Sequence, residues 1–115
     1  MSRRTSAAVG LAGAAPLFAA LGDETRLKIV SRLCTEGPLS IVRLTAGTPL
    51  SRQAITKHLQ ALADAGIVRA AGHVGQRQRV WQLAPRRLDE ARQHLERLSR
   101  EWDEALGRLR ALVEE

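Results

Sequence analysis

Apolar residues recur at helical spacing along most of the chain, in short segments separated by glycine and proline. The first such segment, with Leu17, Phe18 and Leu21, indicates a short helix. Residues 1–15 precede it and are interpreted as a loose N-terminal arm. Asp23 is suited to cap a second helix, which Gly37 and Pro38 should end. Three residues of this helix are expected to face a core: Leu27, Val30 and Leu33.

Two further helices are expected before the pattern changes. A short one covers residues 40–46, and a longer one covers residues 51–65. Ser51 can accept a hydrogen bond from an amide of the first turn, and Gly66 can close the helix in a left-handed conformation. The longer helix should turn four apolar residues toward the core: Leu50, Ile55, Leu59 and Leu62.

After Gly66 the helical spacing gives way to two short runs that favour β-strands. "IVRAAG" and "RVWQLA" alternate in part and are separated by the polar stretch "HVGQRQ". They predict a two-stranded hairpin over residues 67–84. Pro85 then suits the first position of a final helix, expected over residues 86–113.

The final helix carries a regular apolar seam. Eight residues follow one another at alternating spacings of three and four: Leu88, Ala91, Leu95, Leu98, Trp102, Ala105, Leu109 and Leu112. This is the heptad pattern by which helices associate. A domain of this size can bury about half of such a seam on its own body. The seam therefore predicts a homodimer, with an interface formed by Leu88, Leu95, Leu98, Trp102, Leu109 and Leu112.

The polar face of the helix over residues 51–65 has an unusual composition. Four of its residues lie at i, i+3, i+4 and i+7 on one side: Gln53, Thr56, Lys57 and Gln60. Arg52 lies beside them, and no carboxylate occurs before Asp64. Amides and guanidinium groups can match base edges, whereas carboxylates would be repelled by phosphates. We therefore expect this helix to enter the major groove of double-stranded DNA, with Arg52 and Gln53 reading bases and Ser51 near a phosphate.

The order of elements predicts a mainly α fold with a small β-hairpin, the winged helix-turn-helix, in one domain over residues 16–115. The hairpin is the wing, and His73, Arg77 and Arg79 are expected to hold phosphates or the minor groove from it. Residues 51–65 are the recognition helix, and residues 86–113 the dimerisation helix.

Charge supports a polyanionic partner. The 115 residues carry a net charge of +6, and residues 1–85 hold 11 Lys/Arg against 4 Asp/Glu. The single cysteine, Cys34, allows no internal disulfide, so a cytoplasmic location is expected and the thiol is interpreted as a small core residue. The alanine-rich start is broken by glycine and proline, which argues against a signal peptide, and no apolar run suggests a membrane helix.

Three segments carry a resemblance to a known family: "LFAALGDETRLKIVSRL", "LSRQAITKHLQALADAGIV" and "VWQLAPRRL". From about residue 16 onward the chain resembles the ArsR/SmtB-type bacterial transcriptional regulators. The resemblance implies a homodimeric winged-helix repressor that binds an imperfect palindrome near its own promoter. It also implies that the first and last helices build the dimer interface.

The metal sites of that family do not carry over. Residues 36–46 contain neither cysteine nor histidine, and Asp89 is followed by Glu90 and Ala91. His94 lies one turn after Glu90, which leaves an improvised site open, but no metal and no other cofactor is expected. No nucleophile-and-base arrangement or phosphate loop indicates an enzyme. The alternatives are a winged-helix protein-interaction module without DNA binding, or a metal- or redox-responsive regulator of the same fold.

Overall fold

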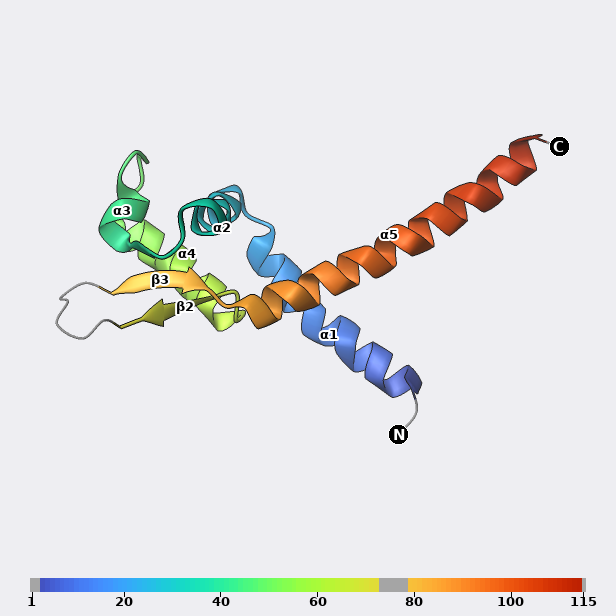
Figure 1. Ribbon diagram of the computed structural model, residues 1–115, viewed down its shortest axis with the longest axis horizontal. Coiled ribbons are helices and arrows are strands. Elements are labelled where there is room, and N and C mark those ends of the chain that lie inside the picture. Colours follow the sequence, from blue (N-terminus) through green and yellow to red (C-terminus); the bar gives the residue numbers. More distant parts are fainter. Residues whose placement is uncertain (1–2, 73–78, 115) are drawn as a thin grey trace.

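The computed structural model describes the backbone of residues 3–72 and 79–114, and the side chains from residue 10 onward within those ranges. Eight elements follow one another: α1 (Arg3–Leu21), α2 (Glu24–Glu36), β1 (Leu39–Ser40), α3 (Ile41–Thr45), α4 (Arg52–Asp64), β2 (Val68–Ala71), β3 (Val80–Leu83) and α5 (Pro85–Glu114). This order confirms the winged helix-turn-helix. Figure 1 shows α2, α3, α4 and the strands gathered at one end, while α1 and α5 cross and extend away from them.

The structure confirms the caps expected at Asp23 and Ser51, and Ser40 caps α3 in the same way. Asp23, Ser40 and Ser51 each accept a hydrogen bond from the backbone N–H three residues later, at 3.0, 3.2 and 3.1 Å. Gly37 and Gly66 follow α2 and α4 with φ of +82° and +79°. That region is strained for residues with a Cβ, so these glycines end their helices at little cost.

The wing hairpin pairs with a further strand, β1, that the sequence did not reveal. β3 pairs with β2 as expected, with Ala70 opposite Trp81, but it also pairs antiparallel with β1 through Leu39 and Trp81. The sheet therefore has the order β1-β3-β2 rather than being a two-stranded hairpin. A strand of two residues is too short to produce an alternating pattern, so only its tertiary pairing identifies it.

The first helix is longer than expected. Residues 3–15 were interpreted as a loose arm, but they continue the helix that ends at Leu21, so this expectation is wrong for that range. Alanine has the highest helix propensity, and this segment is rich in it. Pro16 removes one backbone donor inside the helix. Burial of Ala14 and Leu17 offsets that loss.

Two expectations about α2 are also wrong. Leu27 was placed in the core but is 52% exposed, whereas Ile29 and Leu33 are buried. Each residue turns the helix by about 100°, so Leu27 lies on nearly the opposite side from Ile29. Cys34 was expected to pack in the core and is instead exposed. It follows Leu33 directly, so the same rotation carries it off the buried face.

The core lies where α1, α2, α3, α4 and the sheet meet, around Leu17, Leu44, Leu59, Ile67 and Trp81. α5 joins this core only through its first turns, because Ala91 is its buried residue and Leu88 packs against the cluster. Within the described residues, no helix has the length and apolar character needed to cross a membrane.

Candidate DNA-binding surface

α4 presents the polar face expected from the sequence. Ile55, Leu59 and Leu62 are buried on one side and hold the helix on the core. The expected base- and phosphate-contacting residues of α4 are all exposed on the other side, together with the cap that precedes them: Ser51, Arg52, Gln53, Thr56, Lys57 and Gln60. The structure therefore brings these six residues together on one surface.

Hydrogen bonds along this face set which groups can contact a partner. The Thr56 hydroxyl donates to the backbone carbonyl of Arg52 at 2.7 Å, so its oxygen lone pairs remain as acceptors. The Gln60 side-chain amide donates to Asp64 at 2.9 Å, which draws it toward the only carboxylate of the helix. Cationic side chains therefore lie in the N-terminal half of the face, whereas the Gln60 side chain near its other end is already hydrogen-bonded to Asp64.

The start of α4 is also suited to an anion. Ser51 caps the helix through Ala54, and the N–H groups of Arg52 and Gln53 lie before the first intrahelical hydrogen bond. These N–H groups form the positive end of the helix dipole, and the residues that carry them are exposed. The geometry suits one phosphate beside the residues expected to read bases.

A polar cluster ties α4 to the junction of α1 and α2. Arg26 donates through Nε to the carbonyl of Ala20 at 2.6 Å, and its Nη1 lies 3.4 Å from Nδ1 of His58. Asp23 lies 3.7 Å from the same ring nitrogen. The backbone N–H of Arg26 lowers the pKa of Asp23, and the positive charge of Arg26 adds to this. His58 is half-buried, and the cluster links α4 to the residues at the start of α2.

The other end of α4 is held by Arg87 at the start of α5. Its Nε donates to the carbonyl of Ala65 at 3.2 Å, and its Nη2 donates to the carbonyl of Gly13 in α1 at 3.1 Å. The third nitrogen pairs with Glu90 at 2.6 Å. Arg87 therefore joins the end of α4 to α1 and α5, a role that no spacing in the sequence indicated.

The hairpin of β2 and β3 lies beside the polar face of α4, and Arg79 is exposed just before β3 begins. His73 and Arg77 lie outside the described residues, so their expected contacts stay predictions. Arg69 is opposite Gln82 in the sheet, whereas Ala70 is opposite Trp81. Since side chains alternate along a strand, Arg69 and Trp81 project from opposite faces of the wing.

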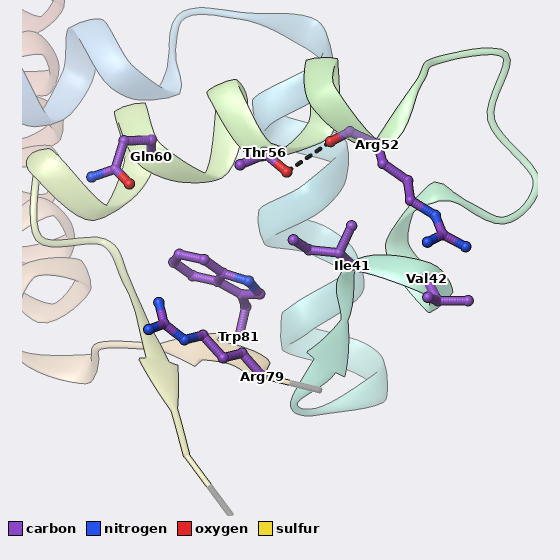
Figure 2. Close-up of a pocket in the computed structure, with 7 residues that line it drawn as sticks. All are labelled: Ile41, Val42, Arg52, Thr56, Gln60, Arg79 and Trp81. Carbon is purple, nitrogen blue, oxygen red and sulfur yellow. Dashed lines mark hydrogen bonds between the residues drawn. The ribbon is translucent and has the colours of Figure 1, made fainter. Parts of the chain in front are cut away.

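A pocket of about 530 Å³ lies between α3, α4 and β3 (Figure 2). It is lined by Ile41, Val42, Arg52, Thr56, Gln60, Arg79 and Trp81. Four of these residues were predicted from the sequence as DNA contacts, but nothing in the sequence placed them around a cavity. The indole of Trp81 is buried, and its Nε1–H has no acceptor among the residues that the structure describes. Trp81 was missed because an aromatic residue in a strand usually indicates only core packing.

The seam of α5 is exposed beyond Ala91. Leu95, Leu98, Leu109 and Leu112 are between half and three-quarters exposed, and Trp102 is 67% exposed. Ion pairs lie beside the seam, where Arg92 reaches Asp89 at 2.7 Å and Glu96 at 2.6 Å. The hydrogen bond from Arg92 lowers the pKa of Asp89 and stabilises its charged form. An apolar stripe with charged flanks is typical of a helix that pairs with another helix.

Glu90, the acid of the improvised metal site, already forms ion pairs with arginines. Glu90 pairs with Arg87 and lies 3.7 Å from Arg86, while His94 is half-buried near Gly10 of α1. Within residues 3–72 and 79–114, no three His, Cys, Asp or Glu side chains form a group that could hold a metal ion.

Comparisons with known proteins agree with this architecture. A helix-turn-helix domain family model matches residues 21–70. The chain is 39% identical over 97 residues to the HTH-type transcriptional regulator Rv2034 of Mycobacterium tuberculosis, covering 83% of each protein. It is similar to the structure of an ArsR-like transcriptional regulator from Rhodococcus sp. RHA1, with a TM-score of 0.71, 35% identity, and coverage of 89% of this chain and 93% of that one.

A further structural neighbour is a homodimeric winged helix-turn-helix DNA-binding domain from Mycobacterium bovis, described as a possible ArsR-family regulator. Its TM-score is 0.63 at 23% identity, and the match covers 92% of this chain and 91% of that domain. At this identity the likeness shows a shared fold.

Proposed function

Because the chain belongs to the ArsR family of helix-turn-helix transcriptional regulators, we propose that it is a homodimeric repressor that reads a palindromic operator through α4. The observation that carries this proposal is the exposed face of α4. It combines amides, a hydroxyl and two cations, and its one carboxylate lies at the far end. A surface helix without a charged partner would ordinarily mix acids and bases there.

The roles within the face follow from position along α4. Arg52 and Gln53, in the first turn, meet base edges in the major groove, with Thr56 and Lys57 one turn deeper. Each good bidentate base contact supplies about 1–3 kcal/mol of discrimination. Ser51 and the adjacent N–H groups hold a phosphate, and Arg79 holds the backbone from the wing together with His73 and Arg77.

Dimerisation supplies the second half-site. The exposed seam of α5 supports pairing of two chains, and the homodimeric neighbour has the same fold. Two recognition helices related by a twofold axis would enter successive major grooves about 34 Å apart. Such a dimer represses by occupying promoter DNA.

The test is fluorescence anisotropy on the duplex upstream of the chain's own gene and on a scrambled duplex of equal length, at two salt concentrations. We expect tighter binding to the native duplex that persists at the higher salt, because base contacts do not depend on counterion release. Arg52→Ala should reduce the preference for the native duplex while leaving the dimer intact. No binding to either duplex would instead favour a protein-interaction module.

A further inference from the structure

We propose that the pocket between α3, α4 and β3 binds a small aromatic carboxylate, and that this ligand and DNA exclude each other. Its volume of about 530 Å³ is in the range of small-molecule sites. Binding of the ligand stands on the pocket alone, whereas the exclusion of DNA also rests on the proposed function.

The walls of the pocket are chemically divided. Ile41, Val42 and the buried indole of Trp81 provide apolar surface. Phosphate and sugar oxygens gain no hydrogen bonds from such walls, so the DNA backbone is a poor occupant. A flat aromatic ring gains both apolar burial and stacking on the indole. The apolar part of the pocket therefore favours a small molecule over the polynucleotide backbone.

The polar groups select a negative charge. Arg52 and Arg79 are among the residues that line the pocket, and its described lining contains no carboxylate. The Arg79 guanidinium lies beside the indole of Trp81, whereas that of Arg52 points away from it (Figure 2). Figure 2 shows Arg79 and Gln60 toward one end and Arg52 toward the other, with the indole of Trp81 between. Arg79 and Trp81 are two residues apart, so they share one face at the start of β3. A ring stacked on Trp81 would place its carboxylate at Arg79.

The same residues explain why the ligand would release DNA. Arg52 and Thr56 lie on the face proposed to read bases, and Arg79 is proposed to hold the backbone. A ligand carboxylate that pairs with Arg79 neutralises a charge required for phosphate contact. Ligand binding in the pocket would thus weaken DNA binding directly, without a conformational change elsewhere in the chain.

The experiment uses the ¹⁵N-labelled full chain with 2-naphthoate as the probe and its uncharged amide, 2-naphthamide, as the control. The chain has two tryptophans, so its two indole N–H resonances report on separate places, and Trp102→Phe identifies which is which. No DNA is present in this titration. We expect 2-naphthoate to shift the Trp81 resonance saturably and to leave the Trp102 resonance unchanged.

Two variants test the charge. Arg79→Gln should weaken 2-naphthoate binding about tenfold, the effect of losing one charge-assisted hydrogen bond. Arg69→Gln removes the same charge from the other face of the wing and should leave binding unchanged. The proposal is overturned if the Trp81 resonance does not move, if both resonances move alike, if 2-naphthamide binds as tightly as 2-naphthoate, or if both variants behave alike.

A second titration adds the native duplex. We expect 2-naphthoate to raise the apparent dissociation constant of the duplex, and simultaneous binding of both would overturn the mutual exclusion. If the duplex fails to bind at all while the Trp81 resonance still shifts, the proposed function fails and the ligand site stands.

Discussion

Replacing Trp102 with glutamate should convert the dimer into monomers. Trp102 is 67% exposed in the isolated chain and lies in the middle of the α5 seam. A tryptophan can bury about 250 Å², so about 170 Å² remains for a partner to cover. At about 25 cal/mol per Å², that burial stabilises the dimer by about 4 kcal/mol per chain. Glutamate is a good helix former, so α5 itself should persist.

The expected effect on association is large even when burial is incomplete. A twofold dimer contains two copies of the residue, so half of the full burial still amounts to about 4 kcal/mol, or about a thousandfold in the dissociation constant. The entropy lost on association is common to both proteins and cancels in the comparison. Sedimentation velocity over a concentration series measures the two constants directly.

The control for this substitution is Leu27→Glu, which places the same acid at another exposed apolar residue, on α2. We expect it to remain dimeric, while Trp102→Glu loses both the dimer and tight operator binding. A Trp102→Glu protein with an unchanged dissociation constant would refute the assignment of the interface to α5. Dissociation by Leu27→Glu would place the interface on α2 instead.

Three further predictions concern the stability of the contacts that hold α4 and its polar face in place. Ser51→Ala removes the hydrogen bond that the N–H of Ala54 donates to the Ser51 hydroxyl. Urea unfolding should show that the free energy of unfolding falls by about 1 kcal/mol. Gly66→Ala should cost at least about 1–2 kcal/mol in the same assay, because φ is +79° and the new Cβ would lie 2.9 Å from Cγ of Arg87. The pKa of Asp23 is lowered in the folded state, so its carboxylate stabilises the fold above the ordinary value of 3.8 and this contribution is lost as the pH falls through the lowered value. Asp23→Asn keeps the cap without titrating, so melting temperatures across this range should depend less on pH; an unchanged dependence would contradict the assignment.

Local chemistry made much of the fold predictable. Asp23, Ser40 and Ser51 identify helix starts because a side-chain oxygen must satisfy a backbone N–H there, and Gly66 identifies an end because φ is positive. The buried side of α4 was also predictable, because its apolar residues repeat at helical spacing along one side only. The wrong placement of Leu27 shows the limit of this reasoning, because two phases were possible on α2 and only packing decides between them.

The features missed by the sequence depend on contacts between distant segments. β1 is defined by its pairing with β3, and the pocket is defined by three elements that meet there. Whether residues 3–15 would continue the helix across Pro16 depended on its packing against α5. A local sequence pattern cannot show that contact. The candidate reading face was predictable as a set of residues, whereas its neighbouring cavity was not.

The attachment of α5 to α4 also bears on operator geometry. In a dimer paired through α5, the separation of the two recognition helices depends on the direction in which α5 leaves the wing. Arg87 holds that direction by binding the carbonyls of Ala65 and Gly13, and the N–H of Ala84 donates to the carbonyl of Ile67 at 2.8 Å. These contacts connect the α5 seam to α4, so in the proposed dimer the spacing of the two half-sites would depend on contacts that touch neither DNA nor the partner chain.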